Sequence, residues 1–251
     1  MNVVYINTHD SGRMLSPYGY DIPTENLKRF AEDSLVFTNA FCAGPTCSPS
    51  RAALLTGTFP HQNGMLGLAQ RGFSLHIPEK HLASFLKNNG YHTCLCGIQH
   101  EYGWYLDLEK QGLHNMGYED ILTTDSTSFK KEDLHIWDKN NAEEVVKWLD
   151  NYKDSKPFFL AYGMHSTHRP YPIEIADCID ERYIIPPYPL KNNEENRHDH
   201  AQYMTTANYA DQNIKKIIDA LKRNNLYENS IIIFTTDHGL AIPFNKCNLT
   251  D

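Results

Sequence analysis

The chain has 251 residues, 41% of them hydrophobic, and a formal net charge of −8 at pH 7. This length and composition suit one large domain, or one and a half, with a sizeable core. The acidic balance argues against a nucleic-acid partner, which would need a basic face, and no apolar run approaches the ~18 residues of a membrane span. We therefore expect neither nucleic acid nor a membrane as a partner.

The chain starts almost directly in a short apolar strand. It lacks the basic segment and the longer apolar segment that make up a secretion signal. We expect a cytoplasmic protein, or a periplasmic or secreted one if the amino terminus has been clipped. The cysteines have neither disulfide-rich nor zinc-finger spacing, and we expect most of them to be reduced core thiols. They stand at positions Cys42, Cys47, Cys94, Cys96, Cys178 and Cys247.

Short apolar runs alternate with helical patterns along the chain, which is typical of a parallel sheet buried on both faces. In chain order we predict a strand at 3–6, a helix capped by Thr24 and ending near 33, a weak strand at 35–41, a helix at 80–89, a weak strand at 91–96, a helix at 141–152, a strand at 158–162, a long surface excursion at 170–197, a helix from about 198 to 224 and a strand at 231–234.

The alternating order of strands and helices predicts a doubly wound α/β fold with a mostly parallel sheet flanked by helices. The longest predicted helix supports this, because Ile214, Ile217, Ile218 and Leu221 form a core-facing stripe.

Polar motifs follow three of the predicted strands. His9 and Asp10 follow the first strand, His165 and His168 follow a middle one, and Asp237 and His238 follow the last. Open α/β sheets gather their active sites beyond the carboxyl ends of strands, so we expect these motifs to converge.

The most informative motif is Cys47-x-Pro49-Ser50-Arg51. Four fixed positions should occur by chance in a chain of this length at a rate on the order of one in a thousand. Good helix formers follow, so Cys47 should lie near a helix amino end, where unpaired N–H groups and the helix dipole favour an anion. The alternative is a buried cysteine that caps a helix.

This motif resembles the signature of the type I (formylglycine-dependent) sulfatases of the alkaline phosphatase superfamily. The pattern of residues 2–68 is most similar to the heparan N-sulfatase (sulfamidase) branch and its bacterial relatives. The resemblance extends in family order over nearly the whole chain. Its later anchors are Gly97-Ile98-Gln99-His100, His165-Ser166-Thr167-His168-Arg169-Pro170 and Asp237-His238-Gly239.

The resemblance implies an alkaline phosphatase/sulfatase-like fold, with residues 1–251 as the amino-terminal catalytic domain. In sulfatases a smaller α+β domain follows, so we expect a chain truncated before that subdomain and a catalytic domain incomplete at its carboxyl end.

The resemblance also implies that a maturation enzyme oxidises Cys47 to Cα-formylglycine, held in place by Arg51. The aldehyde hydrate carries two hydroxyls on one carbon. One attacks sulfur and releases the alcohol, and deprotonation of the other then expels sulfate and restores the aldehyde.

A divalent metal is implied by the same comparison. Its expected ligands are His9, Asp10, residue 47, Asp237 and His238, where His9 departs from the aspartate that the family has at that position. Calcium is favoured on family grounds, whereas two imidazole ligands would shift the preference to Mn²⁺ or Zn²⁺. The alternative for Asp237-His238-Gly239 is a plain turn after a strand.

By resemblance, His168 is the acid that protonates the leaving group, a role that suits an imidazole titrating near neutrality. His165 is a structural or substrate-binding neighbour that could exchange roles with it. His100 matches the histidine that hydrogen-bonds the formylglycine hydroxyl. Lys246 stands where the family has a sulfate-binding cation, although a plain surface lysine is the alternative.

Two further positions bear on the substrate. The family has a lysine where this chain has Ile98, so one sulfate-binding cation is missing. Arg169 is the candidate for a contact to a sugar carboxylate or a second sulfate.

The leading hypothesis is a hydrolase of sulfate esters or sulfamates on a sulfated small molecule or glycan. A phosphodiesterase or phosphonate monoester hydrolase of the same superfamily is the nearest enzymatic alternative. An inactive sulfated-glycan-binding fragment is the alternative from another class. All of this requires Asp10, residue 47 and Asp237 to meet in one pocket.

Overall fold

The computed structural model describes residues 1–103 and 110–247. Its centre is a five-stranded sheet in the order β3-β2-β4-β1-β5, and every strand pair in it is parallel. This confirms the predicted α/β fold class. The strands are β1 (Asn2–Thr8), β2 (His92–Gly97), β3 (Asp120–Ile121), β4 (Phe158–Gly163) and β5 (Ser230–Thr236).

Four predicted strands correspond to β1, β2, β4 and β5, but the weak strand at 35–41 is wrong. That segment is irregular, and its apolar side chains are largely exposed, with Leu35 at 89% and Phe41 at 87%. Strand propensity takes effect only where a partner strand and a packed face are available. Neighbouring strands already occupy both sides of β1.

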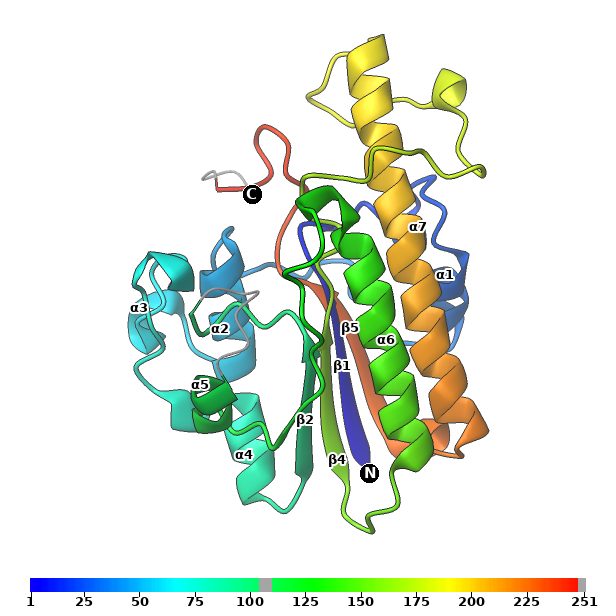
Figure 1. The fold of residues 1–251 in the computed structure, drawn as a ribbon. Coiled ribbons are helices and arrows are strands. Elements are labelled where there is room, and N and C mark those ends of the chain that lie inside the picture. Colours follow the sequence, from blue (N-terminus) through cyan, green and yellow to red (C-terminus); the bar gives the residue numbers. More distant parts are fainter. Residues whose placement is uncertain (104–109, 248–251) are drawn as a thin grey trace.

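Helices cover the sheet on both faces, as Figure 1 shows. They are α1 (Glu25–Glu32), α2 (Cys47–Thr56), α3 (Pro60–Asn63), α4 (Leu82–Asn88), α5 (Lys110–Asn115), α6 (Leu134–Asn151) and α7 (Glu194–Arg223). Short 3₁₀ turns lie at Ser16–Tyr18, Ala69–Arg71, Pro78–Lys80, Lys131–Asp133, Glu181–Tyr183 and Tyr227–Asn229. None of the helices within the described ranges is long and apolar enough to cross a lipid bilayer.

Two apolar clusters separate these layers. On one face α1, α6 and α7 pack on the sheet, with Val145, Ile214 and Ile217 against Val4 and Leu160. The opposite face packs against α2, α4 and α5. Its cluster includes Tyr5, Leu55, Leu86, Leu95, Met116 and Phe159. Strands buried on both faces explain the continuous apolar runs in the sequence.

Helix α6 begins at Leu134, seven residues before the predicted start at 141. The buried face of its first turns includes polar side chains, Asp138 and Asn141, that interrupt the apolar stripe. Periodicity of apolar residues therefore missed the amino-terminal half of the helix.

Thr24 occupies the N-cap position of α1, as predicted, but its side chain makes no capping bond. The carboxylate of Asp211, on α7, accepts instead from the backbone N–H groups of Asn26 and Leu27 at 3.1 and 2.7 Å. The helix is thus capped from a distant element.

The long excursion is present, irregular apart from one 3₁₀ turn, and it ends where α7 begins at Glu194. No disulfide joins any of the six cysteines, all of which lie in the described residues. The expectation that most are core thiols is wrong for half of them, since Cys42, Cys178 and Cys247 are exposed.

Candidate active site

The candidate site lies beyond the carboxyl ends of three adjacent strands. Strands β4, β1 and β5 are neighbours and run parallel, so the residues that follow them reach the same edge of the sheet. The backbone N–H of Asp10 donates to Oδ1 of Asp237 over 2.8 Å, and the N–H of His9 donates to the carbonyl of Ser166 over 3.0 Å. The three motifs therefore meet.

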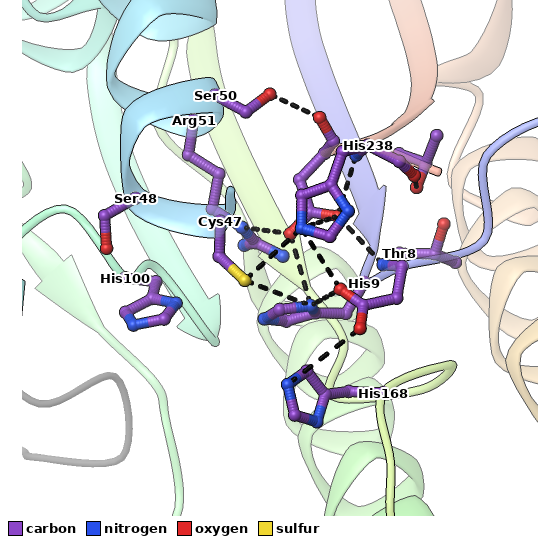
Figure 2. A network of polar contacts seen from close by, with 12 residues as sticks. Thr8, His9, Cys47, Ser48, Ser50, Arg51, His100, His168 and His238 are labelled. Atoms are coloured by element: carbon purple, nitrogen blue, oxygen red, sulfur yellow. Dashed lines mark hydrogen bonds and ion pairs between the residues drawn. The ribbon is translucent and has the colours of Figure 1, made fainter. Parts of the chain in front are cut away.

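Helix α2 brings Cys47 to this edge as its first residue. The Cys47 thiol is buried, with Sγ 3.4 Å from Nε2 of His238 and 3.9 Å from Nδ1 of His9. One turn further, the Ser50 hydroxyl donates to the carbonyl of Asp237. Figure 2 shows the Cys47 side chain pointing toward the His9 and His238 rings.

Five potential metal ligands lie together. One donor atom from each of His9, Asp10, Cys47, Asp237 and His238 lies within 4.8 Å of the others, and all five residues are buried. Oδ1 of Asp10 is 2.7 Å from Nδ1 of His9 and 3.2 Å from Nε2 of His238. These three residues alone place one oxygen between two imidazoles.

Both carboxylates of the cluster are held in the ionised form. Burial by itself raises the pKa of Asp10 and Asp237, but neighbouring charges outweigh it and lower both pKa values below the usual range. For Asp10 these neighbours include His9 and Lys246, and for Asp237 they include His9 and Arg51. Burial lowers the pKa of His9, whereas Asp237 and Asp10 raise it, and a bound metal would take the place of the proton on this imidazole.

This donor set fits a divalent cation. Two ionised, buried carboxylates repel each other, and a cation between them would relieve that repulsion. Imidazole nitrogens beside carboxylate oxygens are typical ligands of Zn²⁺ and Mn²⁺, whereas Ca²⁺ prefers a shell of oxygen atoms alone.

Arg51 and Lys246 supply fixed positive charge next to the carboxylates. Nε of Arg51 is 3.1 Å from Oδ2 of Asp237, and both side chains are buried. Nζ of Lys246 is 2.5 Å from Oδ2 of Asp10. The local positive charge that an acidic protein needs in order to bind an anion is therefore present at this edge.

His100 and His168 both lie near the His9 ring. The His100 ring centroid is 6.0 Å from that of His9, and its Nε2 is 2.8 Å from Oε1 of Gln70. Nε2 of His168 is 4.0 Å from Oδ2 of Asp10, and its ring centroid is 4.5 Å from that of His9. Burial lowers the pKa of His100 to about 2 and that of His168 to about 4.

His165 is fully enclosed, whereas the His168 side chain keeps 26% of its surface exposed. Their ring centroids are 5.1 Å apart. Of the two, only His168 has both solvent access and a position at the carboxylates.

Two positions that bear on the predicted substrate contacts make other contacts within the protein. The Arg169 guanidinium pairs with both oxygens of Asp199 on α7 and lies over the Tyr171 ring, 4.5 Å from its centroid. Ile98 is buried in an apolar cluster with Leu134 and Trp137. This position therefore contributes no positive charge to the site.

Several residues of the site have no signal in the sequence. Gln70 contacts His100 from a 3₁₀ turn, Glu101 is buried beside Arg51, and Asp138 holds the turn that carries His165. Asp138 lies before the helix predicted at 141–152, so the sequence pattern did not mark it either.

The fold and the site together define a parallel α/β domain with a cluster of metal-ligand type beside a helix amino end. The chain belongs to the sulfatase family, whose sequence model, described as Sulfatase, matches residues 1–247. This confirms the family resemblance.

Several known proteins are similar to this chain. Human N-sulphoglucosamine sulphohydrolase is 26% identical to this chain over 99% of the chain and 52% of its own length. A solved structure in complex with its substrate D-glucosamine-2-N,6-O-disulfate has a TM-score of 0.68 at 18% identity, covering 95% of this chain and 65% of that one. A phosphonate monoester hydrolase of Agrobacterium radiobacter also has a TM-score of 0.68, at 17% identity, with coverage of 95% and 62%.

These two solved structures share the fold. The chain spans about half the length of the human relative.

Proposed function

We propose that this domain carries the reactive centre of a sulfatase that hydrolyses sulfate esters or sulfamates on a sulfated glycan. The observation that carries the proposal is the position of Cys47. Its Sγ lies at the amino end of α2 and within the cluster of His9, Asp10, Asp237 and His238. A residue at that point, once oxidised to formylglycine, would present its hydrate to a sulfate group bound at the same cluster.

A divalent cation would be held by His9, Asp10, Asp237, His238 and the modified residue 47. When bound, it would polarise a sulfate oxygen and favour the ionised hydrate. On the two imidazoles in the donor set, we propose Mn²⁺ or Zn²⁺ rather than the calcium expected from the family.

The surrounding residues have separable roles in this proposal. Arg51 orients the hydrate and offsets the negative charge of Asp237, and the His100 ring hydrogen-bonds a hydrate hydroxyl. Lys246 binds a sulfate oxygen. His168 protonates the leaving oxygen or nitrogen, since it is the one ring of the histidine pair that is open to solvent and close to Asp10.

We further propose a sulfated amino sugar as the substrate. The human relative is named for N-sulphoglucosamine, and one structural relative binds a glucosamine disulfate. Because Arg169 is paired with Asp199, a second anionic group of the substrate would have to compete for that guanidinium.

The experiment uses the full-length protein, expressed with and without a formylglycine-generating enzyme. Intact mass gives the state of residue 47, and turnover is followed on an aryl sulfate and an N-sulfated glucosamine. Activity should appear only in the converted protein. Cys47→Ser should be inactive, whereas Cys94→Ser, a change at another buried cysteine, should remain active. An active sample with Cys47 wholly a thiol would refute the mechanism.

The phosphonate monoester hydrolase alternative is supported by the shared fold and by Ile98 in place of a sulfate-binding lysine. Parallel rates on an aryl sulfate and an aryl phosphonate separate the two, since a faster phosphonate reaction would favour it. Tight binding of a sulfated oligosaccharide without turnover by converted, metal-loaded protein would instead favour a binding function.

A further inference from the structure

Asp138 is a charged side chain that no part of the proposed chemistry uses. It lies on α6, in the interior, with 0% of its surface exposed. Its carboxylate faces the turn that follows β4 and accepts three hydrogen bonds there. These come from the backbone N–H of His165 at 2.8 Å, the N–H of Ser166 at 2.7 Å and the hydroxyl of Ser166 at 2.7 Å.

The opposite side of this turn is bonded to the segment after β1. The N–H of His9 donates to the carbonyl of Ser166 at 3.0 Å, and the N–H of Thr167 donates to the carbonyl of His9 at 3.0 Å. The Thr167 hydroxyl donates to the same carbonyl at 2.6 Å. The turn is thus held between Asp138 on one side and the His9 backbone on the other.

The turn itself determines where two imidazoles lie. The N–H of His168 donates to the carbonyl of His165 over 2.8 Å, so this hydrogen bond joins the two residues in one turn. Their rings approach the His9 ring, with centroid distances of 6.3 Å from His165 and 4.5 Å from His168. A shift of the turn would therefore change the distance of His168 from Asp10.

The type of side chain at position 138 is informative. No ion pair with Asp138 is found in the described parts of the chain, and burial raises the pKa of its carboxyl to about 7 against the three hydrogen bonds that favour the ionised form. An asparagine of the same size has one acceptor oxygen, and in either orientation its NH₂ group would face a donor, the His165 N–H or the two donors of Ser166. An ionised carboxylate can accept all three hydrogen bonds, and these bonds offset the cost of burying its charge.

We propose that Asp138 is a positioning residue that fixes the His165–His168 turn against His9 and thereby places the His168 imidazole at the leaving group. The proposal deepens the sulfatase function and rests on it for the kinetic readout. The placement of the turn is a structural claim that can be tested without turnover.

The structural test compares the histidine ring resonances of wild type and Asp138→Asn by NMR, with the His165 and His168 signals assigned through His→Gln variants. We expect both signals to shift, and those of His61 and His76, which lie in a different part of the fold, to remain unchanged. Unchanged His165 and His168 signals in a folded Asp138→Asn protein would overturn the proposal, whether or not the protein is a sulfatase.

The kinetic test uses leaving groups that differ in their need for an acid, in the full-length, formylglycine-bearing protein. A nitrophenolate leaves without protonation, whereas an alkoxide needs it. Asp138→Asn should lower kcat on an alkyl sulfate about 100-fold and on nitrophenyl sulfate less than about threefold, as expected for a misplaced acid. Equal losses on both substrates would indicate a merely structural role and would contradict the proposal.

Ser166→Ala provides a graded variant in case Asp138→Asn does not fold. It removes one of the three bonds and leaves the carboxylate in place. The same two readouts should move in the same direction by a smaller amount. If this variant leaves both the resonances and the ratio of the two rates unchanged, the proposal is wrong.

Discussion

Arg51 donates from Nε to Oδ2 of Asp237 over 3.1 Å, and this ion pair joins the first turn of α2 to the end of β5. Both side chains are buried, with relative exposures of 2% and 1%. The pair therefore attaches the helix that carries Cys47 to the carboxylates of the proposed metal site. Arg51 belongs to the cysteine motif of the sequence, and Asp237 belongs to the polar motif that follows the last strand.

Loss of Arg51 should destabilise the whole domain. Arg51→Ala leaves Asp237 buried without its cation, and removal of one partner of a buried pair costs about 3–5 kcal/mol. Urea unfolding should show this fall in the free energy of unfolding. Arg182→Ala is the matched control, because Arg182 pairs with Asp180 at the surface and its loss should give no resolvable change. Equal stability of the two variants would contradict the prediction.

Metal binding should stabilise the folded protein. A ligand at about 100 times its Kd adds about 2.7 kcal/mol to the free energy of unfolding. Addition of Zn²⁺ or Mn²⁺ to chelator-treated protein should therefore raise the Tm by several degrees, and chelator should reverse the change.

Asp10→Asn should abolish most of that increase, whereas Asp150→Asn on the surface of α6 should retain it. Thermal shift with and without metal gives the comparison. A metal response that survives Asp10→Asn would place the cation elsewhere.

Glu101 should make stability fall as pH rises. Burial raises the pKa of its carboxyl to about 8, with Arg51 opposing the shift, and its Oε2 has no hydrogen-bond partner among the residues that the structure describes. The folded pKa lies above the unfolded value, so this stabilisation is present at pH below about 4.5 and is lost as pH rises through 8. Over that range the slope approaches about 1.4 kcal/mol per pH unit.

Glu101→Gln cannot ionise, so its stability relative to wild type should increase between pH 5 and pH 9. Urea unfolding at several pH values measures this difference. Glu195→Gln makes the same charge change at an exposed position of α7, and its stability relative to wild type should not vary with pH. A constant difference for Glu101→Gln would show that the carboxyl is ionised in the folded protein.

Asp211 should contribute to stability but not to catalysis. It accepts hydrogen bonds from the backbone of Asn26 and Leu27 and from the Asn26 side chain, and so caps α1 from α7. Asp211→Ala should lower the free energy of unfolding by about 1–3 kcal/mol.

The kcat of Asp211→Ala should remain that of wild type at temperatures well below its Tm. Asp219→Ala, an exposed change on the same helix, is the control for stability. A large drop in kcat for Asp211→Ala at full folding would show that α1 also shapes the site.

Local patterns in the sequence were sufficient for the fold class. Continuous apolar runs at β1 and β4 and the stripe along α7 follow from burial of a parallel sheet on both faces, and both can be recognised in the sequence alone. The prediction of a weak strand at 35–41 is wrong because a strand also needs a neighbouring strand to pair with, and the sequence of the segment does not show whether one is present. The start of α6 was missed because polar residues are buried on its inner face.

For the site, the sequence determined which residue types are present and that three motifs follow strand ends, since motif order and strand direction are properties of the chain itself. Only the tertiary structure decided that Cys47, Asp10 and Asp237 lie in one buried cluster, that Arg169 is paired with Asp199, and that Asp138 holds the turn of His165 and His168. These relationships join residues that are from 27 to more than 200 positions apart in the chain. Such distances are set by packing of helices on the sheet, which no local pattern specifies.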